Sequence, residues 1–126
     1  MTTRSGAPYF LDLFQIRFPV GAVCSIAHRI SGVILAVSVP LLIFALHRSL
    51  AGPEGYATVV TTLATVAGKA ALVLLAWALG HHALAGVRHI LKDMDVGASL
   101  GSARRTAWLA LAGGGIIALV AAVLVL

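Results

Sequence analysis

Two short motifs hold most of the side chains in this sequence that could do chemistry. The first runs from Ser25 to Arg29 with the sequence SIAHR, and the second runs from His81 to His89 with the sequence HHALAGVRH. Imidazole nitrogens bind iron, a hydroxyl group donates hydrogen bonds, and guanidinium groups pair with carboxylates. Together these residue types suit an iron-containing cofactor that carries acidic groups, or a small ligand with carbonyl oxygens.

Helical spacing brings the members of each motif onto common faces. His82 and His89 are seven residues apart, almost two turns, so they lie on one face of a helix with Gly86 between them. The bare glycine leaves a patch where a flat ligand could lie against the backbone. Ser25 and Arg29 are four residues apart and also share a face.

The composition of the chain excludes a soluble enzyme. Of 126 residues, 60% are hydrophobic and 10% are charged, whereas a soluble domain carries roughly 25% charged residues. Nine Lys and Arg against four Asp and Glu give a net charge of +5, but most cations lie between hydrophobic runs, which indicates membrane topology rather than nucleic-acid binding. The single cysteine, Cys24, can form neither an intrachain disulfide nor the attachment motif of a c-type haem.

Three hydrophobic stretches are each long enough to cross a bilayer, which takes about 20 apolar residues. They predict an all-α membrane protein with one transmembrane anchor domain over residues 1–126 and helices at about 20–48, 56–92 and 104–126. The connecting segments carry turn residues, Gly52-Pro53 in the first and Gly97 and Gly101 in the second.

The distribution of cations predicts the orientation. The N-terminal segment and the second loop share one side and hold seven cations, whereas the first loop holds Arg48 alone. These seven are Arg4, Arg17, Arg29, Arg88, Lys92, Arg104 and Arg105. The positive-inside rule places the N-terminus in the cytoplasm and the C-terminus in the periplasm, and Lys69 then falls at the opposite interface. No Arg- and Ser-rich transit segment precedes the first span, so we expect a multi-pass protein of the bacterial plasma membrane.

Depth along the second span separates the histidines by role. His82 falls about 9 Å inward of Arg88 by the helical rise, deep enough to ligate the iron of a b-type haem. His28, Arg29 and His89 lie near the surface, where they could bind the haem propionates. A second iron ligand would come from His28 or from a partner helix.

A simpler interpretation stays open for each polar group. A single histidine in a membrane helix often makes only an interhelical hydrogen bond. Arg88, Lys92, Arg104 and Arg105 are interpreted as orientation signals rather than as ligand contacts.

The two motifs, taken together, resemble a known family. The pattern S-I-x-H-R-x-S-G beginning at Ser25 is followed about fifty residues later by H-x-x-x-G-x-R-H beginning at His82. Flanking matches are Leu11-Asp12-Leu13, Ile16-Arg17-Phe18-Pro19, Pro53-Glu54-Gly55 and Asp93. This combination is similar to the cytochrome b556 membrane-anchor subunits of succinate dehydrogenase, respiratory complex II, over about residues 11–93.

The resemblance implies a role for each matched residue. His82 would be the axial ligand of haem b, with His28, Arg29 and His89 near the propionates. Ser25 and Arg29 would contribute to the ubiquinone site. Weaker quinone contacts would come from two apolar residues before the first span, Leu13 and Phe18.

The resemblance also implies partners. A flavoprotein subunit would oxidise succinate with FAD, an iron–sulfur subunit would carry the electrons, and a second small membrane-anchor subunit would supply the other haem ligand. This chain would then join the tricarboxylic acid cycle to the respiratory chain without a dicarboxylate site of its own. The alternatives are the anchor of a fumarate reductase or menaquinone-linked relative, and a small structural or transport membrane protein without cofactor.

Overall fold

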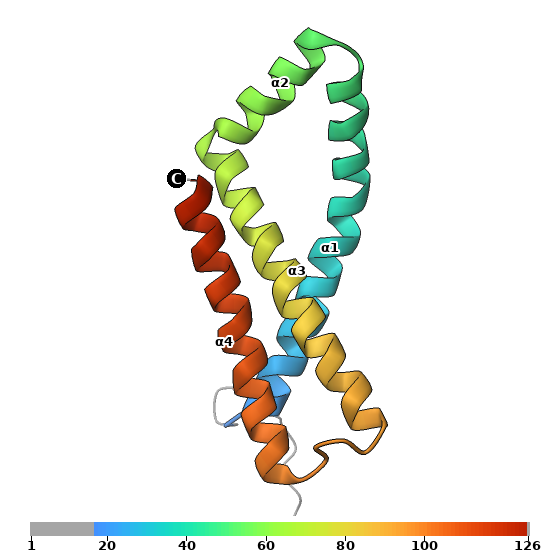
Figure 1. The fold of residues 1–126 in the computed structure, drawn as a ribbon, viewed down its shortest axis with the longest axis vertical. Helices are drawn as coiled ribbons and strands as arrows, with labels where there is room; N and C mark the ends of the chain where they lie inside the picture. The colour runs from blue at the N-terminus through green and yellow to red at the C-terminus, as the bar shows by residue number, and fades with distance from the viewer. Residues whose placement is uncertain (1–16, 126) are drawn as a thin grey trace, which may run out of the picture.

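The computed structural model describes residues 17–125, and this part of the chain consists of helices and short connections. Figure 1 shows four helices: α1 (Val20–Leu50), α2 (Pro53–Ala64), α3 (Val66–Asp93) and α4 (Leu100–Val125). The described residues contain no strand. The predicted all-α class is therefore confirmed.

Three of the helices, α1, α3 and α4, are long and apolar enough to cross a membrane. They contain 31, 28 and 26 residues, so at about 1.5 Å per residue each exceeds the roughly 30 Å of a hydrocarbon core. The predicted number of spans is confirmed.

The segment predicted as one helix over about residues 56–92 is divided at Thr65 in the structure. The backbone of Thr65 is extended, with φ −66° and ψ 158°, and it ends α2 and begins α3. The Thr65 hydroxyl accepts a hydrogen bond from the Gly68 amide at 3.1 Å, which caps α3. The second span therefore begins at Val66, and α2 starts earlier than expected because Pro53 occupies its first turn.

Small residues let α3 pack closely along α4. Figure 1 shows these two helices side by side along much of their length, while α1 crosses α3 and then diverges from it. A Cβ atom added to Gly114 of α4 would lie 2.8 Å from the Cβ of His81 in α3. The buried apolar residues of this region are also small: Ala78, Ala85, Ala107 and Ala110, with Cys24 from α1.

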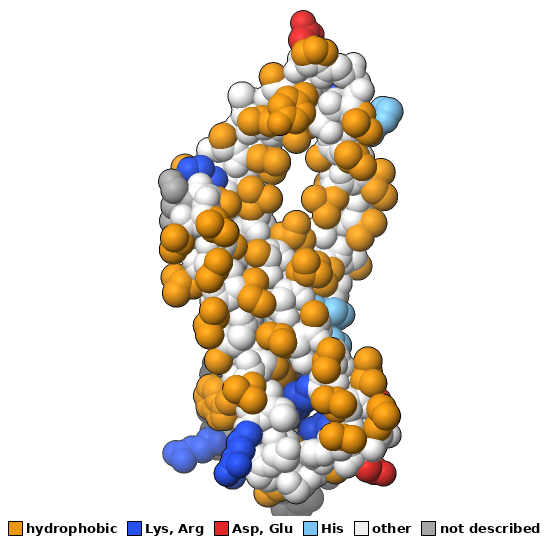
Figure 2. Space-filling view, viewed as in Figure 1, with side chains coloured by type: hydrophobic (Ala, Val, Ile, Leu, Met, Phe, Trp, Pro, Cys, Tyr) orange, Lys and Arg blue, Asp and Glu red, His pale blue; other side chains and the backbone are white. Residues whose placement is uncertain are grey.

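The outer surface of the described chain is mostly hydrocarbon. Large apolar side chains are exposed along the whole length of α1 and α4, such as Leu41, Phe44, Leu109 and Leu119. Figure 2 shows hydrophobic side chains over most of the molecule, with Lys and Arg gathered mainly where α3 connects to α4. We call this the basic end, and it comprises residues 17–29 and 88–105. Such a surface is stable in lipid and not in water.

Candidate functional site

His82 points from α3 toward α1, and its hydrogen bonds fix which ring nitrogen carries the proton. Its Nδ1 atom lies 3.1 Å from the carbonyl oxygen of His28 and 3.3 Å from the Ser31 hydroxyl. A carbonyl oxygen only accepts, so Nδ1 donates, and the neutral ring keeps its lone pair on Nε2. Histidines that ligate metals are held in this way, with one nitrogen bonded to a carbonyl and the other free for the metal.

Ser31 and Gly32 on α1 also contact the His82 ring. The Ser31 side chain is fully buried, and its hydroxyl donates to the His28 carbonyl at 2.8 Å. A Cβ atom at Gly32 would lie 2.9 Å from Cε1 of His82, so only glycine allows this approach. Both residues belong to the S-I-x-H-R-x-S-G pattern, but the sequence reasoning gave neither of them a role.

His28, His82 and His89 form one group, which we call the histidine cluster. The rings of His28 and His82 stack with centroids 4.1 Å apart and planes 14° apart. The His89 ring lies 5.1 Å from that of His28, tilted by 43°. The juxtaposition expected from the two motifs is therefore present where α1 crosses α3.

The patch expected at Gly86 faces the His28 side chain of α1. A Cβ atom at Gly86 would lie 3.6 Å from the Nε2 atom of His28. This distance is an ordinary van der Waals contact, so a small side chain here would touch the His28 ring without a clash. The Nε2 atom of His28 is buried and has no hydrogen-bond partner among residues 17–125.

Of the residues expected at the quinone site, Ser25 and Arg29 lie within one turn of His28 on α1, and the other two precede the helix in the sequence. Ser25 is half-buried and Arg29 is exposed on α1. Phe18 precedes α1 and is 47% exposed, whereas Leu13 lies outside the described residues. Ser25 and Arg29 thus place a hydroxyl and a guanidinium group close along α1 to the histidine cluster.

Arg88 is buried and makes a contact between helices that the sequence did not predict. Only 7% of it is exposed, and its Nε donates to the Thr106 hydroxyl while its Nη2 donates to the Ala103 carbonyl oxygen, each at 3.2 Å. Arg88 therefore ties α3 to α4. Its spacing of seven residues from His81 could have signalled this position, because both lie on the face of α3 that meets α4.

His81 faces α4, although it is adjacent to His82. Its side chain is fully buried, and Nδ1 lies 3.2 Å from the Ala110 carbonyl oxygen. Its ring is nearly parallel to that of Trp77, with centroids 5.6 Å apart. Neighbouring residues of a helix point about 100° apart, so the two histidines serve different helix contacts.

The part of the chain that the structure describes has no group of three or more His, Cys, Asp or Glu side chains that could hold a metal ion. The cluster offers histidine nitrogens only. Such a donor set suits iron that a macrocycle already binds through four of its positions.

Comparison with known proteins shows the family of this chain. The family described as "Succinate dehydrogenase/Fumarate reductase transmembrane subunit" matches residues 3–123. The chain belongs to this family. The match extends through α4, beyond the region that the motifs covered, and it confirms the resemblance inferred from them.

Two curated proteins are similar to this chain over most of their length. The succinate dehydrogenase cytochrome b556 subunit of Coxiella burnetii (strain RSA 493 / Nine Mile phase I) is 34% identical over 102 residues, which cover 80% of this chain and 82% of that protein. The succinate dehydrogenase cytochrome b556 subunit of Paracoccus denitrificans is 29% identical over 115 residues, covering 91% and 88% respectively.

Proposed function

We propose that this chain is the haem b-binding membrane anchor of a succinate:quinone oxidoreductase. The observation that carries the proposal is the hydrogen bond between His82 Nδ1 and the His28 carbonyl oxygen. It leaves a lone pair on Nε2 of a histidine in a candidate membrane span, where a polar side chain usually marks a function. The names of the two relatives support the same cofactor.

The residues of the histidine cluster fit a b-type haem. His82 would bind the iron through Nε2, with Ser31 and the His28 carbonyl oxygen orienting its ring. The Nε2 atom of His28 is buried without a hydrogen-bond partner, as is that of His81 at α4; a propionate would supply the partner that His28 lacks. His89 and Arg29 would also bind the propionates. When bound, the haem would supply one-electron transfer.

The second axial ligand would come from another subunit. The His28 and His82 rings stack with centroids 4.1 Å apart, and this spacing leaves no room for a macrocycle between them. His28 therefore does not face His82 across a haem. We assign the second ligand to a second small membrane-anchor subunit.

The proposed quinone site lies beside the cluster on α1. The hydroxyl of Ser25 and the guanidinium group of Arg29 would donate hydrogen bonds to the carbonyl oxygens of ubiquinone, and Phe18, with Leu13, would contact its apolar parts. Arg29 is exposed at the basic end, so protons could reach the reduced quinone from water.

The remaining chemistry would belong to soluble partners. Iron–sulfur clusters are held by several cysteines, and this chain has one. The clusters would therefore lie in an iron–sulfur subunit. This subunit and a flavoprotein subunit with FAD would dock at the basic end, beside the proposed quinone site. Even without the buried Arg88, six of the seven predicted cations remain to direct this end to the cytoplasmic side of a bacterial plasma membrane.

Adjacent histidines provide a matched test of the haem ligand. The complex is purified through a tag on this chain, and its dithionite-reduced minus oxidised spectrum is recorded for His82→Leu and His81→Leu. We expect His82→Leu to lose or shift the α-band of haem b and His81→Leu to keep it, because His81 faces α4. A wild-type complex without a b-type band, or a band lost only in His81→Leu, would refute the assignment.

A further inference from the structure

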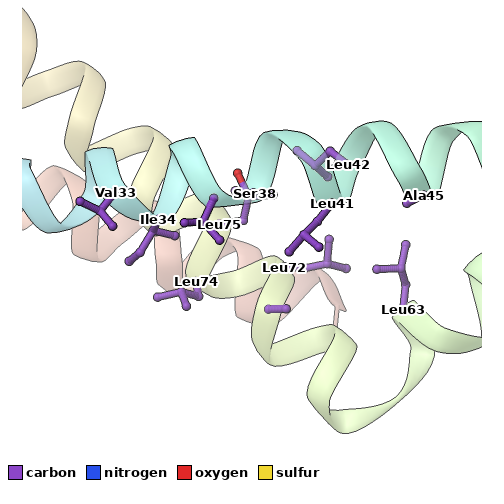
Figure 3. A pocket seen from close by; sticks show the side chains of 12 residues that line it. Val33, Ile34, Ser38, Leu41, Leu42, Ala45, Leu63, Leu72, Leu74 and Leu75 are labelled. Carbon is purple, nitrogen blue, oxygen red and sulfur yellow. The ribbon is translucent and has the colours of Figure 1, made fainter.

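A cavity of about 490 Å³ lies between α1, α2 and α3, away from the histidine cluster. Figure 3 shows its wall, in which Leu41 of α1 faces Leu63 of α2 and Leu72 of α3. Its one polar lining side chain is Ser38, whose hydroxyl donates to the Leu35 carbonyl oxygen at 2.7 Å. The lining of the cavity is therefore almost entirely apolar and suits an apolar ligand.

The break at Thr65 and two close backbone contacts build this space. Beyond its crossing with α3, α1 diverges, and α2 spans the resulting gap (Figure 1), which is also open in the space-filling view of Figure 2. A Cβ atom at Gly55 would collide with the Arg48 carbonyl oxygen, and one at Gly68 would lie 2.6 Å from the Cα of Leu63. These glycines fix both ends of α2, so the three helices form a frame around the cavity.

The length of the cavity corresponds to one lipid leaflet. Its lining on α1 begins at Val33 and ends at Ala45, twelve positions further along the helix, or about 18 Å by the helical rise. Half of a hydrocarbon core of about 30 Å is about 15 Å. An acyl chain of the leaflet opposite the basic end would therefore occupy most of its length.

A cation lies where the headgroup of such a lipid would be. A second cavity of about 190 Å³ shares Ala45 and Leu63 with the first and continues to Arg48. The hydroxyl of Thr62, which also lines it, is already bonded to the Thr58 carbonyl oxygen at 2.8 Å. Arg48 is exposed at this mouth, beside His47 and at the same end as the exposed Glu54, and its guanidinium charge complements a phosphate.

We propose that α1, α2 and α3 bind one anionic phospholipid, with its phosphate at Arg48 and one acyl chain in the cavity. The site lies outside the haem and quinone residues and does not depend on their assignment. Its occupant would hold α1 and α3 apart at the end where the side chains of residues 17–125 leave the space unfilled.

A cavity-filling variant tests the acyl-chain position. The complex is purified in mild detergent, and bound phospholipid is counted by native mass spectrometry and by extraction. We expect about one retained anionic phospholipid per wild-type chain, at least tenfold less in Ala71→Phe, and an unchanged amount in Ala67→Phe, which is one turn away and outside the lining. Leu72→Trp, at another lining position, replaces Ala71→Phe if that variant does not fold.

A charge variant tests the headgroup position. In competition between phosphatidylglycerol and phosphatidylcholine, Arg48→Gln should lower the preference for phosphatidylglycerol about fivefold, the effect expected of one cation near a membrane surface. Arg105→Gln, at the basic end, should not change this preference.

Three outcomes would overturn the proposal: equal effects of the two arginine substitutions, a wild-type complex that retains no lipid, or an Ala71→Phe complex that keeps its lipid but loses a partner subunit. The last outcome would mean that a partner helix fills the cavity.

Discussion

Removal of the Ser31 hydroxyl gives the sharpest test of how the chain holds His82. In Ser31→Ala, the 3.3 Å contact with Nδ1 is lost, while the 3.1 Å bond to the His28 carbonyl oxygen remains. The ring keeps its tautomer but loses one of its two partners. A typical net hydrogen bond contributes about 1 kcal/mol, so we expect haem to dissociate about fivefold faster.

A second serine on the same helix provides the control for this experiment. Ser38 donates to the Leu35 carbonyl oxygen at 2.7 Å, just as Ser31 donates to that of His28 at 2.8 Å, each three residues earlier. Ser38→Ala therefore removes the same kind of helix contact without touching His82. Haem transfer from the purified complex to an excess of apomyoglobin is followed by absorbance. Equal rates for the two variants would show that Ser31 does not position the haem ligand.

Two further predictions concern the helix contact and the quinone site. Gly114→Val should lower the midpoint of thermal unfolding, because its Cβ would lie 2.8 Å from that of His81; the loss of stability should be roughly 1–3 kcal/mol. Gly115→Val is the control, because Gly115 has open space around it, and it should leave the midpoint unchanged. Equal midpoints for the two variants would contradict the close packing of α3 on α4. Ser25→Ala and Arg29→Leu should depress succinate:quinone activity and leave succinate-dependent dye reduction at the flavoprotein intact. Unchanged quinone reduction in both variants would contradict the proposed site.

Local patterns of the sequence predicted much of the fold and the family. The three apolar stretches gave the number of spans, because crossing a bilayer demands a minimum apolar length whatever the helices contact. The seven-residue spacing of His82 and His89 gave their common face, because relative angles on a helix follow from its pitch. The motifs that begin at Ser25 and His82 led to the family, which the comparisons then confirmed.

Tertiary structure alone decided which helix each face meets and where a helix stops. Spacing gives the angle between two side chains and not the direction of either, so only packing showed that His82 faces α1 while His81 and Arg88 face α4. The same packing put the His28 ring beside Gly86. The helix break at Thr65 lies inside a mostly apolar stretch, where the sequence pattern did not indicate it. The Thr65 side chain caps α3 there in competition with the helical hydrogen bonds, and the break creates the space between α1, α2 and α3.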